Sequence, residues 1–457
     1  MGRRAHSRPL SIWTNGELVG YWTPAGNQPT RLAYADGWLT SAAARPPRSA
    51  RWPRPSPLSL PLPLLDNQPL RGERVENFFE NLLPESSAIR KRLAQRYAAG
   101  SEGTFDLLAA IGRDCVGAVQ LLDAHEEPTG FDRIEGEPLD DEAVAALLRR
   151  TVTGPPFGKQ EPEHDFRISI AGAQEKTALL RHQGQWMRPL GATPTTHIIK
   201  LPLGLVGNMQ ADMRTSVYNE WLCLKLLAAL GFDVAQADIV TFADHPAVLV
   251  VERFDRKPHP SGQWIVRLPQ EDFCQARGVN PAIKYEADGG PGIEQLAQVL
   301  HGSQNARADL RTLLASQITF WLMAATDGHA KNFSIRLHAA GAYAMTPLYD
   351  VLSAWPIIGH GKNQLAWKSA RLAMAVSGKN RHYHLSNILR RHFNATAARC
   401  GWGDHAEDII GELLAKMDGA IETVARQLPS GFPDDVASAM FEGMRAQARR
   451  LQEQPAA

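Results

Sequence analysis

The 457-residue sequence has little of several features that mark common classes of protein. Its cysteines are few and lie far apart, at Cys115, Cys223, Cys274 and Cys400. This spacing forms neither a CxxC metal pattern nor the dense disulfide framework of a small secreted protein, so we expect reduced, mostly buried thiols. The largely apolar run 318–325 is far too short to span a bilayer. No apolar core follows the first arginines, as a signal peptide requires, and we therefore expect a cytoplasmic protein.

A marked excess of charge of one sign is also missing. The sequence has 49 Lys and Arg residues against 48 Asp and Glu residues, a net charge of +1. No global field therefore attracts nucleic acid or an anionic membrane. Two familiar phosphate-binding patterns are absent as well, because the segment GAQEKT lacks the second glycine of a P-loop and no GxGxxG precedes a helix. The sequence favours neither a P-loop ATPase nor a Rossmann enzyme.

The sequence does contain enough apolar residues to form the cores of two or three domains, since 44% of its 457 residues are hydrophobic. It opens with the alternating stretch SIWTNGELVGYW, in which Asn15-Gly16 is placed as a hairpin turn. Prolines crowd the segment 45–63, which excludes a helix interior and predicts an extended connector. Two helices follow. A polar, Pro/Gly-rich stretch then predicts a domain boundary near residue 150.

The rest of the chain divides into two further parts. Short strand-like runs with one inserted amphipathic helix, which ends at Gly231, are typical of a small nucleotide-holding lobe. From about Ile293 the apolar residues recur at helical spacing to the C-terminus. We therefore expect an N-terminal α/β subdomain at 1–150, a nucleotide-binding N-lobe at 151–272 and a helical C-lobe at 273–457.

The sequence TDGHAKNF contains the strongest chemical signal. It follows a helix with one apolar face, which we expect to stop at Gly328. Asp327 and Asn332 have the spacing of the kinase catalytic loop, in which the Asp accepts the proton of the substrate hydroxyl and the Asn binds magnesium. Asp350 follows eighteen residues after Asn332, where a kinase holds a second metal-binding carboxylate. Carboxylate and amide oxygens together with substrate phosphates are the ligands that magnesium favours.

Several upstream residues complete this kinase-like order. Lys200 lies in the strand-like stretch HIIKLP, where it can clamp phosphates, and Glu220 opens the next helix as its carboxylate partner. The segment VVERFD leaves a strand just before the helical half, where a two-lobed kinase hinges, so we expect Glu252 and Phe254 to line the adenine site. The small residues of SIAGAQEKT allow close approach of a phosphate, and Ser169 stands at the edge of this segment.

Each feature alone has a simpler explanation. A single D-x-x-x-x-N match usually reflects helix capping or turn chemistry. Lys200 alone reads as an edge-strand lysine, Asp350 as an N-cap and His329 as a hydrogen-bonded support rather than a metal ligand. What favours a kinase is the order of six features: phosphate loop, strand lysine, helix glutamate, hinge, catalytic Asp/Asn and metal-binding Asp.

Long stretches of the chain resemble the HipA family. They are FRISIAGAQEKTALL, TPTTHIIKLP, VERFDR, RLPQEDFCQ, KYEADGGPGI, ATDGHAKNFS and TPLYDVLSA, and earlier FFENLLPES and FDLLAAIGRDCVGAVQLL resemble the N-terminal region of the full-length toxins. The resemblance weakens only over the first residues, the proline segment and the last helices. It implies an α/β plus all-α architecture: a two-lobed protein-kinase-like fold with an extra N-terminal α/β subdomain and a helical C-terminal lobe.

The resemblance also implies a role for each matching position. Asp327 would be the catalytic base, Asn332 and Asp350 the magnesium ligands, and Ser169 an autophosphorylation site whose modification ejects the phosphate loop. Glu220 would form the supporting ion pair. The residues implied to bind ATP are Ala171, Gly172, Ala173, Gln174, Glu175, Lys176, Lys200, Glu252, Arg253, Phe254, His329, Lys331 and Asn332.

The implied cofactors are ATP and Mg²⁺, and the implied biology is that of a type II toxin-antitoxin system. The family's toxins phosphorylate glutamyl-tRNA synthetase, while a small HipB-like helix-turn-helix antitoxin binds the toxin and represses the operon. Contact with operator DNA would then run mainly through the antitoxin, and no membrane is involved. Two alternatives stay open: a kinase of the same fold that acts on another protein or small-molecule acceptor, and a non-catalytic corepressor scaffold.

Overall fold

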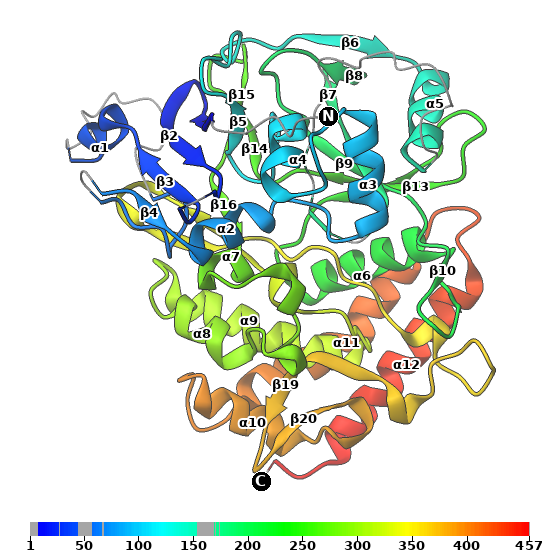
Figure 1. Cartoon of the computed structure of the whole chain (residues 1–457). Coiled ribbons are helices and arrows are strands. Elements are labelled where there is room, and N and C mark those ends of the chain that lie inside the picture. Colours follow the sequence, from blue (N-terminus) through cyan, green and yellow to red (C-terminus); the bar gives the residue numbers. More distant parts are fainter. Residues whose placement is uncertain are drawn as a thin grey trace.

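The computed structural model describes residues 8–26, 28–43, 57–65, 68–152, 169, 171–172 and 174–456. Two sheets with their helices form the upper half in Figure 1, and the C-terminal helices form the lower half. The expected residue Ala173 and most of the Pro/Gly-rich stretch after residue 150 lie outside the described residues, as do residues 44–56 of the proline segment.

The first unit is built on a five-stranded sheet of order β4-β3-β2-β1-β5. Its strands are β1 (Leu10–Thr14), β2 (Glu17–Thr23), β3 (Arg31–Tyr34), β4 (Leu70–Arg71) and β5 (Gln120–Asp123), and its helices are α1 (Asp36–Ala43), α2 (Glu73–Glu80), α3 (Ser87–Arg96) and α4 (Thr104–Ile111). The predicted β1–β2 hairpin is confirmed, with positive φ at Asn15 and Gly16. Trp22 of β2 stacks on Phe79 of α2, with 3.8 Å between the ring centroids, and so ties helix to sheet.

The second sheet has six strands in the order β12-β13-β9-β7-β8-β6, with every neighbouring pair antiparallel. The strands are β6 (Gly136–Leu139), β7 (Lys176–His182), β8 (Gln185–Pro189), β9 (His197–Lys200), β12 (Ala237–Val240) and β13 (Val248–Glu252). A small hairpin, β10 (Leu205–Val206) with β11 (Ala211–Asp212), leads into α6 (Ser216–Leu230). As predicted, α6 ends at Gly231, which adopts a left-handed φ of 100°.

The expected boundary near residue 150 differs from the structure. Strand β6 joins the second sheet, and α5 (Asp141–Val152) packs on it, so that Val144 and Leu148 share a core with Leu179 and Ile199. The apolar face of α5 needs a partner to exclude water, and this sheet supplies it. The first unit therefore gives way to the second sheet after β5.

The lower half contains the helices α7 (Phe273–Arg277), α8 (Ile293–Leu300), α9 (Ala306–Leu322), α10 (Arg390–Arg399), α11 (Glu407–Ala425) and α12 (Asp434–Glu453). Short strands accompany them: β16 (Gln270–Asp272), β17 (Ser334–Leu337), β18 (Tyr343–Met345), β19 (Arg371–Ser377) and β20 (Arg381–His384). The hairpin of β14 (Arg256–Pro258) and β15 (Ile265–Arg267) lies in the upper half (Figure 1). The expectation of an almost wholly helical region was wrong at β19–β20. Six consecutive residues of β19 are buried. The strand therefore lacks the alternation of buried and exposed residues by which a sequence pattern separates a strand from a buried helix.

The helix before the catalytic motif also ends earlier than expected. Helix α9 stops at Leu322, and Ala324 follows in the left-handed region with φ 48°. Gly328 therefore does not stop the helix. It lies against the ring of Phe320, where an added Cβ would come within 2.6 Å. Within the described ranges, none of the helices has the length and apolar character needed to cross a membrane.

Glu271 of β16 ties the end of the proline segment to the lower half. Its side chain is fully buried, and its carboxyl group accepts hydrogen bonds from the Ser59 hydroxyl and from the Leu60 amide at 2.9 Å. Burial raises the pKa of Glu271 to about 8, although both hydrogen bonds oppose the rise.

This pKa predicts how stability depends on pH. Between pH 4.5, the ordinary value for Glu, and about 8 the folded protein retains a proton that the unfolded chain has lost. The contribution of Glu271 to the free energy of unfolding should therefore fall as pH rises, by up to about 1.4 kcal/mol per pH unit. Chemical unfolding followed by tryptophan fluorescence across this range, with Glu271→Gln as reference, measures the effect. A difference between the two proteins that does not change with pH would contradict the raised pKa.

Candidate active site

A cleft of about 210 Å³ lies where the first unit, the second sheet and the lower half meet. Most residues singled out from the sequence line it, although they come from distant parts of the chain. Those that line the cleft are Ala171, Gly172, Gln174, Lys176, Lys200, Glu220, Glu252, Arg253, Phe254, Asp327, His329, Lys331, Asn332 and Asp350. Ser169 and Glu175 do not line it.

The predicted lysine–glutamate ion pair is present. The ammonium of Lys200 on β9 lies 2.6 Å from a carboxylate oxygen of Glu220 on α6, and both side chains are buried. It also lies 2.5 Å from a carboxylate oxygen of Asp350. Burial lowers the pKa of Lys200, but these two carboxylates outweigh burial and raise it, so the ammonium stays charged. A fixed positive charge of this kind suits a phosphate.

Lys176 adds a second cation beside the first. It pairs directly opposite Lys200 in the β7–β9 ladder. Burial, opposed by Asp350 and reinforced by the neighbouring Lys200, lowers the pKa of Lys176 to about 8. A Cβ on Gly172 would lie 2.5 Å from the Lys176 ammonium, and Gly172 has a left-handed φ of 114°. Glycine thus lets the loop backbone lie against this cation.

The TDGHAKNF segment presents Asp327 to the cleft. The Asp327 side chain is 55% exposed, and one carboxylate oxygen accepts a hydrogen bond from the Tyr285 hydroxyl at 2.5 Å. Desolvation by the surrounding protein raises the pKa of Asp327, whereas the Tyr285 hydrogen bond lowers it. His329 lies 3.9 Å from the same carboxylate oxygen, and burial lowers its pKa to about 3. His329 is therefore a neutral support for the Asp327 region.

Asn332 and Asp350 form a pair of oxygen donors that fits magnesium. The Asn332 amide nitrogen donates to the Asp350 carbonyl at 2.9 Å, and the Asn332 Oδ1 atom is buried without a hydrogen-bond partner. Burial raises the pKa of Asp350, but Lys200 and Lys176 outweigh burial and hold it well below its usual range. In the part of the chain that the structure describes, no group of three or more His, Cys, Asp or Glu residues could hold a metal. An oxygen pair that relies on substrate phosphates for its remaining ligands is typical of magnesium sites.

Ser169 and the phosphate loop are attached to the first unit. The Ser169 hydroxyl donates to the Leu82 carbonyl at 2.7 Å, its amide donates to the Asp114 carbonyl at 3.0 Å, and the residue is fully buried. The Glu85 amide donates to the Gly172 carbonyl at 3.2 Å. Glu175 pairs with an arginine of α3 instead of facing the cleft. The first unit thus holds the loop that approaches the cleft.

Comparison with known proteins places this geometry in a family. Residues 10–122 match the HipA N-terminal domain, and residues 168–421 match the HipA-like C-terminal domain. The chain belongs to the HipA family. It is 34% identical over 350 residues to the protein named "Putative kinase Y4mE" of Sinorhizobium fredii, covering 76% of this chain and 77% of that protein. It is 29% identical over 308 residues to the serine/threonine-protein kinase toxin HipA of Shewanella oneidensis, covering 64% and 66%.

A solved structure agrees with the two-lobed, kinase-like HipA fold of this chain. HipA in the complex of Shewanella oneidensis HipA, HipB and operator DNA superimposes with a TM-score of 0.74 at 22% identity, covering 97% of each chain. The expected fold class is thereby confirmed.

In this HipA-family chain the ammonium of Lys331 is paired with protein groups and is not free to bind a nucleotide. Its ammonium donates to an Asp272 carboxylate oxygen at 2.6 Å and to the Asn81 side-chain oxygen at 2.7 Å, and the residue is only 8% exposed. The cation therefore joins the TDGHAKNF segment to the end of α2. Cleft residues that had no role from sequence include Asn81, Glu85, Asp272 and Lys284, and a fifth such residue, Tyr285, contacts the cleft residue Asp327. The stretches FFENLLPES and KYEADGGPGI contain four of these five.

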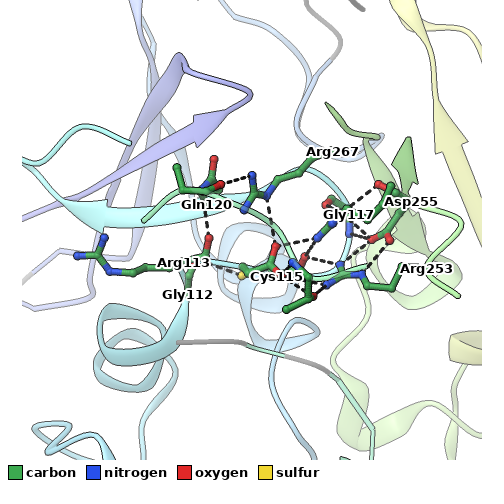
Figure 2. A network of polar contacts seen from close by, with 12 residues as sticks. Gly112, Arg113, Cys115, Gly117, Gln120, Arg253, Asp255 and Arg267 are labelled. Atoms are coloured by element: carbon green, nitrogen blue, oxygen red, sulfur yellow. Dashed lines mark hydrogen bonds and ion pairs between the residues drawn. The ribbon is translucent and has the colours of Figure 1, made fainter. Parts of the chain in front are cut away.

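The hinge is anchored by a buried network of charges, which Figure 2 shows. Glu252 and Phe254 line the cleft, but the Arg253 guanidinium is buried and binds both carboxylate oxygens of Asp255, at 3.0 and 2.8 Å. It also lies 3.2 Å from a carboxylate oxygen of Asp114 in the first unit. Arg253 thus holds the backbone between the two cleft-lining residues.

Proposed function

We propose that this chain is an ATP-dependent protein serine/threonine kinase that acts as the toxin of a type II toxin-antitoxin pair. The observation that carries the proposal is the convergence in one cleft of the Lys200–Glu220 ion pair, the Asp327 carboxylate and the oxygen pair of Asn332 and Asp350. These are the groups that phosphoryl transfer requires, because the reaction depends mainly on positioning and charge stabilisation. The two relatives named as kinases support the same activity.

In this mechanism each group of the chain has a separate task. Lys176 and Lys200 bind the phosphates of ATP, while Glu220 keeps Lys200 aimed at them. Asn332 and Asp350 would hold magnesium, which would neutralise charge on the phosphates. Asp327 accepts the proton of the acceptor hydroxyl as its oxygen bonds to the γ-phosphorus, while the bond from that phosphorus to the β–γ bridging oxygen breaks and ADP leaves.

Glutamyl-tRNA synthetase is the proposed acceptor, and Ser169 is the proposed site of self-inactivation. The Ser169 hydroxyl is buried against the Leu82 carbonyl. A phosphate at this oxygen would bring roughly two negative charges into a buried position and remove its hydrogen bond to Leu82. The loop would then leave the first unit, and the cleft would lose its phosphate-facing wall.

The proposed partner is a HipB-like helix-turn-helix antitoxin that also makes most of the contact with operator DNA. The solved relative is a HipA from a complex with HipB and operator DNA, which supports this assignment. The net charge of +1 agrees with DNA contact that runs mainly through a partner. Because the proposed target belongs to translation, the proposed location of the protein is the cytoplasm.

Mass spectrometry of intact protein and of peptides tests the kinase proposal. We expect that purified protein incubated with ATP and magnesium adds phosphate to Ser169 and to glutamyl-tRNA synthetase from the same organism. Neither product should form with EDTA or with Asp350→Asn, because that variant loses a charged metal ligand.

Other outcomes separate the alternatives. Phosphate on Ser169 alone would keep the kinase but remove this synthetase as the acceptor. An absence of phosphate anywhere, on protein that carried none on Ser169 at the start, would favour the non-catalytic scaffold.

A further inference from the structure

Tyr285, in the stretch KYEADGGPGI, contacts the proposed catalytic base. Its hydroxyl lies 2.5 Å from an Asp327 carboxylate oxygen and donates a hydrogen bond to it. The Tyr285 ring also packs edge-on against His329, with 5.0 Å between ring centroids and an interplanar angle of 84°. The phenol hydroxyl therefore donates to the Asp327 carboxylate as the hydroxyl of a bound alcohol would.

An acceptor hydroxyl must form this same bond. A general base has to lie within hydrogen-bonding distance of the proton that it takes, and in kinases that proton belongs to the acceptor hydroxyl. Tyr285 presents an O–H donor to Asp327 at that distance. We propose that Tyr285 is a positioning residue whose hydroxyl fills the place of the acceptor hydroxyl at Asp327 and is displaced when the acceptor binds. This inference rests on the proposed kinase function.

The backbone around Tyr285 is held on both sides. The preceding Lys284 forms an ion pair with Glu85 of the first unit at 2.5 Å. The following Glu286 accepts a hydrogen bond from the Ala375 amide at 2.6 Å. The Gly290 amide donates to the Tyr285 carbonyl at 2.9 Å. Because the backbone is fixed, displacement requires only a rotation of the half-buried side chain.

The electrostatics keep the two groups in matching protonation states. Burial raises the pKa of Tyr285, and the neighbouring Asp327 raises it further, so the phenol remains a donor at neutral pH. The hydrogen bond in turn lowers the pKa of Asp327 against the effect of desolvation. The other titratable groups that act on or face this carboxylate are Lys284, Asp350, Glu85 and His329. Tyr285 thus orients the Asp327 carboxylate and favours its ionised form until the acceptor arrives.

The variant Tyr285→Phe tests the proposal, because it removes the hydroxyl and keeps the ring against His329. Steady-state kinetics of the full chain would use glutamyl-tRNA synthetase and a synthetic peptide of residues 164–174 as acceptors. We expect the KM for the acceptor to fall roughly two- to tenfold, the factor of one net hydrogen bond, without a fall in kcat. Basal ATP hydrolysis, in which water is the acceptor, should rise. The acidic limb of the kcat/KM profile should move to higher pH.

Tyr21→Phe, in β2 and far from the cleft, is the matched control and should change none of these values. The midpoint of thermal unfolding checks that both variants fold. A Tyr285→Phe protein with lower kcat, or with unchanged KM and ATP hydrolysis, would overturn the displacement proposal while the kinase function stands. A wild-type protein without any ATP-dependent turnover would overturn the kinase function and this inference together.

Discussion

Replacing Asp327 with glutamine should lower kcat for phosphoryl transfer by roughly 10²- to 10⁴-fold, the usual contribution of a general base. The amide oxygen of glutamine can still accept the Tyr285 hydrogen bond, but it cannot take the proton of the acceptor. The Asp327 side chain is 55% exposed and bears no short ion pair, so the folded protein should keep its stability. ATP affinity should also remain, because phosphate binding is assigned to Lys176 and Lys200.

Single-turnover transfer from radiolabelled ATP at saturating acceptor measures this loss. Asp404→Gln, at an exposed position just before α11, is the control and should transfer phosphate at the wild-type rate. A near wild-type rate for Asp327→Gln would show that another group accepts the proton. The assignment of TDGHAKNF as the catalytic segment would then be wrong.

Replacing Asp114 with asparagine should lower the free energy of unfolding by about 3–5 kcal/mol, as expected when one member of a buried ion network is lost. The Asp114 carboxylate lies 3.2, 2.9 and 3.3 Å from nitrogen atoms of Arg253, Arg256 and Arg267. It also accepts a hydrogen bond from the Thr195 hydroxyl at 2.7 Å. Without its charge, Arg253 and Arg256 would keep Asp255 as a carboxylate partner, whereas Arg267 would lose its ion pair with Asp114 (Figure 2).

The protonation of Asp114 explains the size of this effect. Burial raises the pKa of Asp114, but the three arginines outweigh burial and hold it well below its usual range. Its contribution to stability is therefore present at neutral pH and is lost as pH falls below the ordinary range of carboxyl groups.

Denaturant unfolding at neutral pH measures the loss. Asp244→Asn, which breaks the exposed pair with Arg149, is the control and should change stability by less than about 1 kcal/mol. A comparably small change for Asp114→Asn would mean that the arginines are solvated rather than buried. Since Arg253 stands between the two hinge residues that line the cleft, a rise in the KM for ATP should accompany the lost stability.

Local patterns in the sequence determined much of this protein. Asn15-Gly16 specifies the first hairpin because two positive φ angles suit these residue types. Gly231 ends α6 for the same kind of reason. The types and order of Lys200, Glu220, Asp327 and Asn332 predicted one polar cleft, and all four residues line it in the structure.

Tertiary structure alone decided which buried charges pair. Lys331 meets Asn81 across 250 positions of sequence, and Asp114 meets Arg267 across 153. Neither the periodicity of the sequence nor a short motif predicts such contacts, because the packing of distant elements determines which groups a buried charge meets. Packing also brought β6 and α5 onto the second sheet. It placed the Tyr285 hydroxyl on the carboxylate of Asp327, because only the folded chain brings these two segments to the same cleft.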